Sequence, residues 1–292
     1  MSLSLRVTRE LLRLRPSSTR SVDSLRKAIR SRGDAAPIPR ALHRVARVRE
    51  TLVNEQRVVH LEPLSGAAGS HLIYTHGGCY TFPLLGAHWG LLASLVARAG
   101  VSVTVPLYGL APEHTVDEAY ELLDRVYREA IVAHGGPVFL GGDSAGGGLA
   151  LGQAQRYRDA GKVAPAGILL ISPWVDATMA NPDIGPLERR DRMLGRAGLV
   201  EAGRLWAGPR DTRDPLVSPL LGDLSGLPPV HVYQGDHDLF LADAKRLARG
   251  IHDAGGQVEL RITRGGFHDF PAAPWLPEAR RAVGRMAEVL QG

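Results

Sequence analysis

Residues 137–147 read PVFLGGDSAGG, and this stretch decides the fold. The apolar run 137–142 predicts a buried strand, and residues 145–160 predict the helix that follows it. Between them Gly142-Asp143-Ser144-Ala145-Gly146 has the pattern of a nucleophile elbow, a strained strand-to-helix turn in which a β-carbon at either glycine would clash. Ser144 would lie at a helix N-terminus, which favours developing negative charge. Ser144 is therefore the candidate nucleophile. A phosphate loop would need Gly-Lys-Ser/Thr, which residues 147–149 lack.

The chain on both sides of this turn alternates short apolar runs with helical patterns. Strands are expected at 57–62, 71–75, 101–105, 137–142, 166–171, 229–234 and 257–263. Helices are expected at 87–99, 116–133, 145–160, 241–254 and 277–290. Such alternation predicts an α/β protein with a mostly parallel central sheet flanked by helices, and near-continuous apolar runs are typical of strands covered on both faces.

A second chemical signal follows the strand 71–75, where the sequence reads His76-Gly77-Gly78-Cys79-Tyr80. Glycines allow the backbone to approach a substrate closely and to direct its amides at one point. An attacked carbonyl becomes an oxyanion and needs such preorganised donors. The amide of Ala145, directly after the candidate nucleophile, would complete an oxyanion hole.

A serine nucleophile needs a base and an orienting acid, in the chain order Ser, Asp or Glu, then His. His268 follows the last expected strand and is the candidate base. Asp236 and Asp238 both follow the strand 229–234; Asp238 is favoured as the acid and Asp236 stays an alternative. The run Asp236-His237-Asp238 is also compatible with a metal ligand set, but no second ligand cluster lies near it in sequence, so we expect no metal and no cofactor.

Five motifs in order resemble the hormone-sensitive-lipase-like carboxylesterases of bacteria, from about residue 55 to the end. The motifs are HGGC at 76–79, YGLAPEH at 108–114, GDSAGG at 142–147, Asp214-Pro215 to Ser218-Pro219-Leu220, and GGFHDF at 265–270. The resemblance implies the α/β-hydrolase fold, a Ser144–Asp238–His268 triad, and an oxyanion hole built from the amides of Gly77, Gly78, Cys79 and Ala145.

The resemblance also implies a small helical cap. Residues 1–45 would form its N-terminal segment, and an insertion at about 178–215 would complete it over a hydrolase domain of residues 46–292. We expect Tyr80, Phe82 and Asp143 to contact the substrate. Cys79 departs from the family, which has a third glycine here; if this position needs a positive φ, a cysteine is strained.

These features predict a serine esterase that hydrolyses short-chain acyl esters through an acyl-enzyme. An amide or formamide hydrolase with the same triad remains an alternative, because leaving-group preference depends on pocket details. A non-catalytic ligand-binding protein on the same fold is a third interpretation, although related receptors have lost the histidine that His268 represents here.

Net charge and cysteine content limit the compartments and partners that we expect for the protein. The net charge is +5, and the basic excess is local, since residues 1–49 hold twelve Arg and one Lys against three acids. No nucleic-acid-binding signature accompanies this charge, so we expect a solvated cap segment, with an anionic membrane or nucleic acid as the other interpretation. Cys79 is the single cysteine, and no signal peptide or membrane span is evident. We therefore expect a cytoplasmic protein with a small-molecule ester as its partner, no nucleic acid, no stable membrane insertion, and a homodimer as an open option.

Overall fold

The computed structural model describes residues 1–66 and 69–292, and it is built around one mixed sheet of eight strands. The strand order is β1-β2-β4-β3-β5-β6-β7-β8, in which β2 is antiparallel to both of its neighbours and all pairs from β4 to β8 are parallel. The strands are β1 (Ala46–Val53), β2 (Gln56–Pro63), β3 (His71–Thr75), β4 (Ser102–Pro106), β5 (Val138–Asp143), β6 (Gly167–Ile171), β7 (Val230–Gly235) and β8 (Val258–Thr263).

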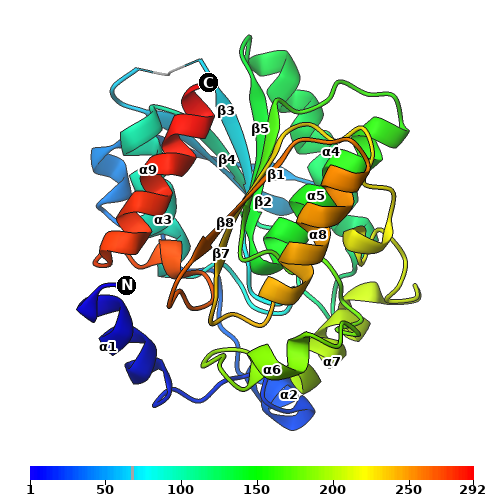
Figure 1. The fold of residues 1–292 in the computed structure, drawn as a ribbon. Coiled ribbons are helices and arrows are strands. Elements are labelled where there is room, and N and C mark those ends of the chain that lie inside the picture. Colours follow the sequence, from blue (N-terminus) through cyan, green and yellow to red (C-terminus); the bar gives the residue numbers. More distant parts are fainter. Residues whose placement is uncertain (67–68) are drawn as a thin grey trace.

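Helices cover both faces of this sheet (Figure 1). Those on one face are α3 (Gly86–Ala99) and α9 (Pro277–Gln291), which pack against each other. Those on the other are α4 (Val116–Ala133), α5 (Ser144–Asp159) and α8 (Leu241–Asp253). Successive strand residues point to opposite faces, so Ile73 enters one hydrophobic cluster while Leu72 and Tyr74 enter the other. The expected fold class, an α/β protein with a mostly parallel sheet, is confirmed.

The expected strands and helices of the core are all present, with bounds that differ by one or two residues. The strand β1 was not predicted. Its burial alternates irregularly and it lies at the edge of the sheet, where charged residues face solvent, so it lacks the apolar run that identified the central strands.

In the part of the chain that the structure describes, four further α-helices lie outside the sheet layers. They are α1 (Leu3–Leu12), α2 (Val22–Arg30), α6 (Ile184–Glu188) and α7 (Arg196–Ala207). Helix α2 packs against α7, and Thr19 Oγ1 accepts a 2.9 Å hydrogen bond from the amide of Gly195. The N-terminal segment therefore contacts the insertion that follows β6, beyond one end of the sheet (Figure 1).

The N-terminal end of helix α1 contacts helix α9, and Arg9 contacts the loop after β7. Leu5 of α1 is fully buried, and the cap residue Ser2 bonds Glu278 of α9 through its amide (2.5 Å) and its hydroxyl (2.8 Å). Arg9 Nη1 lies 3.0 Å from His237 Nε2. These contacts place α1 across the carboxyl ends of the parallel strands, beside the loops that carry the candidate site residues.

Candidate active site

The turn between β5 and α5 has the strained geometry that the glycine pattern predicts. Ser144 has φ = 50°, a left-handed conformation that non-glycine residues rarely adopt, and it is buried. A β-carbon on Gly142 would lie 2.5 Å from Thr75 O, and one on Gly146 would lie 1.9 Å from the same atom. The predicted clash at both glycines is confirmed, and it explains why the serine stands between two residues without side chains.

The loop after β3 also requires its glycines. A β-carbon on Gly78 would lie 2.3 Å from Phe82 O, and Gly78 has φ = 127°. Cys79 and Tyr80 follow with φ = 54° and 60°. The cysteine therefore does occupy a position of positive φ, at a cost of about 1–2 kcal/mol by the usual penalty for left-handed backbone.

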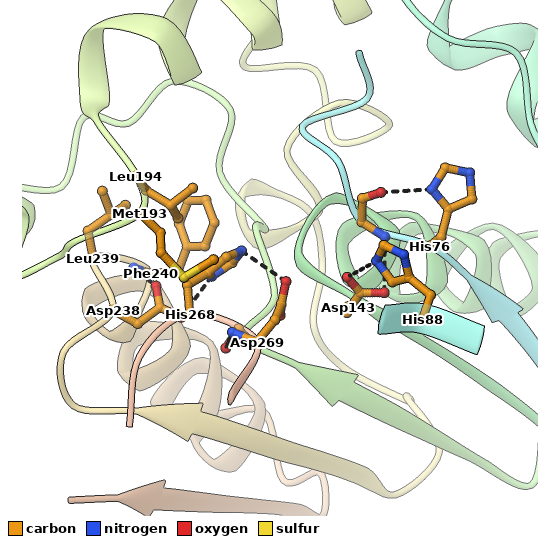
Figure 2. Close-up of polar contacts among 12 residues, drawn as sticks. His76, His88, Asp143, Met193, Leu194, Asp238, Leu239, Phe240, His268 and Asp269 are labelled. Carbon is orange, nitrogen blue, oxygen red and sulfur yellow. Dashed lines mark hydrogen bonds and ion pairs between the residues drawn. The ribbon is translucent and has the colours of Figure 1, made fainter. Parts of the chain in front are cut away.

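Asp143, directly before Ser144, binds this loop to the elbow. Its Oδ1 accepts hydrogen bonds from the Tyr74 hydroxyl (2.5 Å) and the Gly77 amide (3.0 Å), and its Oδ2 lies 3.1 Å from His88 Nε2 (Figure 2). The Leu85 amide donates to His88 Nδ1 at 2.8 Å, so Nε2 carries the proton that His88 donates to Asp143. Burial would raise the pKa of Asp143, but His88 and these donors hold it below its usual range.

The Gly77 amide is thus occupied by Asp143 in this structure. Of the four amides expected around an oxyanion, those of Gly78, Cys79 and Ala145 are the ones not directed at Asp143. The Asp143 side chain holds the backbone of the loop, a role that the sequence did not suggest.

His268 lies in the loop after β8, and its Nδ1 is 2.9 Å from Asp238 Oδ2 (Figure 2). Both side chains are buried, and the other Asp238 oxygen accepts a 2.9 Å bond from the amide of Phe240. Asp236, the alternative acid, instead accepts from the Gly265 amide at 2.6 Å and contacts His237 Nδ1 at 2.7 Å. The geometry therefore joins Asp238, not Asp236, to the histidine.

Two further carboxyl groups lie close to His268 and Asp238, and the sequence motifs did not indicate either one. Asp191, in the insertion, is buried; it accepts from the amides of Met193 (2.7 Å) and Leu194 (2.9 Å) through Oδ1, and from the amide of Leu239 (2.9 Å) through Oδ2. Burial and the nearby charge of Asp238 raise the pKa of Asp191 to about 6. Asp191 thus connects the insertion to the loop that carries Asp238.

Asp269 is the second of these carboxyl groups. Its Oδ2 lies 3.1 Å from His268 Nε2, the ring nitrogen that does not face Asp238 (Figure 2). The motif GGFHDF contains Asp269, but the direction of its side chain depends on a backbone conformation that the sequence does not reveal.

A cavity of about 540 Å³ opens beside these groups, between α1 and the ends of the strands. Asp143, His268 and Asp269 border it, and most of the remaining wall is apolar, including Leu11 and Leu12 of α1. Of the three residues expected to contact substrate, Asp143 lines this cavity. Tyr80 instead stacks on Trp206 of α7 at 4.4 Å between ring centroids, and Phe82 packs against the hydrophobic core.

Cys79 is buried, and burial raises the pKa of its thiol to about 12, with the nearby His268 opposing this shift. The thiol is therefore neutral near pH 7. Within residues 1–66 and 69–292, no three metal-binding side chains gather closely enough to hold an ion. No helix in the same ranges is both long and apolar enough to cross a bilayer.

Comparison with known proteins agrees with this geometry. The sequence profile of the alpha/beta hydrolase fold family matches residues 72–272, more than two thirds of the chain. The chain belongs to this family. Within it, the chain is 35% identical to an acetyl-hydrolase of Streptomyces hygroscopicus (74% of this chain, 73% of that protein) and 32% identical to an esterase of Acinetobacter venetianus (76% and 75%).

Solved structures extend the similarity over the whole length. An esterase from the bacterial hormone-sensitive lipase family superposes with a TM-score of 0.84 at 27% identity, and covers 100% of this chain and 98% of its own. The chain is thus a hormone-sensitive-lipase-like carboxylic ester hydrolase, which confirms the family, the fold and the class of enzyme that the sequence motifs predict.

Proposed function

We propose that this carboxylesterase uses Ser144 as nucleophile, His268 as base and Asp238 as the acid that orients and stabilises the histidine. The observation that carries the proposal is the 2.9 Å contact between His268 Nδ1 and Asp238 Oδ2, at the wall of a cavity that Asp143, the residue before Ser144, also lines. The strained backbone of Ser144 supports it, because such strain is typical of nucleophiles held on an elbow.

The reaction proceeds in two acyl transfers. His268 Nε2 takes the Ser144 hydroxyl proton while Oγ bonds to the ester carbonyl carbon, and the carbonyl electrons move onto oxygen. The amides of Gly78, Cys79 and Ala145 donate to this oxyanion. The tetrahedral intermediate collapses, the alcohol leaves with the proton from His268, and Ser144 stays acylated. Water then attacks with His268 again as base, which releases the carboxylic acid and restores the serine.

The substrates we propose are esters of short acyl chains. The cavity of about 540 Å³ is the size of a small-ligand site, and its apolar wall matches an acyl or alcohol group. Helix α1 and the insertion flank it as a cap, which limits the length of chain that can enter. The acetyl-hydrolase among the relatives supports the same size class.

The test is a chain-length series of p-nitrophenyl acetate, butyrate, octanoate and palmitate. We expect the highest kcat/KM at acetate or butyrate and a fall of at least about tenfold by palmitate. Activity that rises steadily to palmitate would show that the cap does not limit the acyl chain. p-Nitroacetanilide, the amide matched to the acetate ester, tests the amidase alternative; we expect at most a small fraction of the ester rate.

A further inference from the structure

The imidazole of His268 lies between two carboxyl groups. Asp238 Oδ2 is 2.9 Å from Nδ1, as expected for a triad, and Asp269 Oδ2 is 3.1 Å from Nε2 (Figure 2). In the proposed reaction, Nε2 is the atom that must accept the Ser144 proton. Asp269 therefore lies against the one ring atom that has to be free for catalysis.

The backbone holds Asp269 in this position. Asp269 has φ = 54°, its amide donates to Ser172 Oγ at 3.1 Å, and its carbonyl accepts from the Ala272 amide at 3.0 Å. Ser172, directly after β6, is fully buried and also has a positive φ of 43°. Two strained positions on neighbouring loops thus fix the Asp269 backbone and direct its side chain at the histidine.

Across the described residues, the Asp269 carboxylate lacks other hydrogen-bond partners at one of its two oxygens. Its Oδ1 is buried and has no hydrogen-bond partner among the residues that the structure describes, and its carboxylate borders the largely apolar cavity. An ionised carboxylate in such surroundings is costly unless a positive charge pairs with it. Within residues 1–66 and 69–292, the group at ion-pair distance from the Asp269 carboxylate that can carry a positive charge is His268, at 3.1 Å.

Other titratable groups face this pair from the packed elements. They are Tyr74 of β3, Cys79 of the following loop, His88 of α3, Asp143 of the elbow, Asp191 of the insertion, Asp238 after β7 and, at the wall of the same cavity, Arg15 after α1. The tyrosine and cysteine are neutral near pH 7, and His88 donates to Asp143. The acidic groups thus outnumber the cations around His268.

The excess of acidic groups around His268 favours its protonated form, the imidazolium. Burial alone would lower the pKa of His268, but Asp269 and Asp238 outweigh it and raise the pKa well above the ordinary value. Burial raises the pKa of Asp269, and attraction to the imidazolium of His268 opposes that rise.

We propose that Asp269 is a carboxylate latch, which holds His268 as an imidazolium in the resting enzyme and must be displaced or neutralised before His268 can accept the Ser144 proton. The inference rests on the proposed function, since it assigns a regulating role at the same histidine. Before attack, the Nε2 proton passes to solvent through the cavity, and the Ser144 hydroxyl then takes the place of the Asp269 oxygen beside Nε2. Asp269 is thus a positioning residue that acts through His268.

The latch has a specific consequence for pH dependence. A carboxylate beside an imidazolium stabilises the protonated form, so the unprotonated base appears only at higher pH. The acidic limb of kcat/KM, which reports groups of the free enzyme, therefore lies above the ordinary histidine range in the wild type. Removing a neighbouring opposite charge typically shifts a pKa by about 1–3 units, and partial exposure of Asp269 favours the lower end of that range.

The test compares the pH profile of kcat/KM for p-nitrophenyl butyrate, from pH 5 to 9, in wild type, Asp269→Asn and Asp269→Gly. Asparagine and glycine both tolerate the positive φ at this position. We expect the midpoint of the acidic limb to fall by about one pH unit in both variants, so that activity at pH 6, relative to the plateau, rises up to about tenfold. The matched control is Asp253→Asn, at an exposed helix end beside His252, which should leave the midpoint within about 0.2 unit.

Superimposable profiles, or a limb that moves to higher pH, would overturn the latch. An NMR titration of the His268 ring in the Ser144→Ala background gives the same answer without activity: its pKa should fall when Asp269 becomes Asn, and an unchanged value refutes the proposal. Hydrolysis that depends on Ser144 but shows an unmoved limb refutes only the latch. Hydrolysis that persists without Ser144 refutes the proposed function itself.

Discussion

Replacing Asp238 by asparagine should show whether Asp238 or Asp236 is the acid of the triad. Asp238 is fully buried; one of its oxygens bonds His268 Nδ1 at 2.9 Å, and the other accepts from the Phe240 amide at 2.9 Å. Asparagine has one acceptor oxygen for these two donors, so its amide group must face one of them. The variant also removes the negative charge that stabilises the imidazolium formed during attack.

The size of the effect follows from the role of the carboxylate at His268. In a Ser–His–Asp triad, asparagine in place of the acid leaves the histidine in the wrong tautomer and lowers kcat by about 10⁴-fold. We therefore expect kcat to fall by about 10³- to 10⁴-fold, which corresponds to about 4–5.5 kcal/mol of activation free energy. The KM should change little, because Asp238 does not line the cavity.

Asp236→Asn is the matched control, from the same loop. Asp236 is about one third exposed, and its Oδ1 accepts from the Gly265 amide at 2.6 Å, which the oxygen of asparagine can also do. We expect kcat within about fivefold of wild type. Steady-state hydrolysis of p-nitrophenyl butyrate by both variants, with melting temperatures to verify folding, is the assay. Equal losses in the two variants, or a loss confined to Asp236→Asn, would refute the assignment of Asp238.

Two further predictions concern the turn and the cysteine. A β-carbon at Gly146 would lie 1.9 Å from backbone oxygen, so Gly146→Ala should cost about 3 kcal/mol and lower the melting temperature by about 6–12 °C. Gly284, inside α9, faces open space, so Gly284→Ala should instead stabilise by about 0.5–1 kcal/mol; equal melting temperatures would contradict the packing at the elbow. Because the Cys79 thiol is buried with its pKa raised to about 12, iodoacetamide at pH 7.5 should alkylate the unfolded chain at least about a hundredfold faster than the native protein, as read by intact mass. Equal rates would show that the thiol is accessible.

The sequence was sufficient for those features that depend on local chain geometry. The glycines around Ser144 are required by contacts within the turn and with the adjacent strand β3, so a short motif predicted the elbow. The central strands are covered on both faces, and their apolar runs predicted them. His268 follows the last strand at the same sheet edge, and chain order was enough to select it.

Features that depend on distant contacts could not be predicted. Asp191 lies 47 residues before Asp238 in an insertion without regular periodicity, and only the tertiary structure brings it to the acid's loop. Cys79 and Tyr80 both have a positive φ, and the tyrosine ring stacks on Trp206 of the insertion, a contact with a segment more than a hundred residues away. The contact of Asp269 with His268 likewise depends on a left-handed backbone that no motif revealed.

The most direct test of the account is the rate of p-nitrophenyl acetate hydrolysis near pH 8 by wild type and by Ser144→Ala. A serine without its hydroxyl cannot form the acyl-enzyme, so kcat/KM should fall by at least about 10³-fold while the melting temperature stays within a few degrees. Wild-type activity that disappears in the variant is the result that the account predicts. A Ser144→Ala protein that is folded and fully active would contradict it.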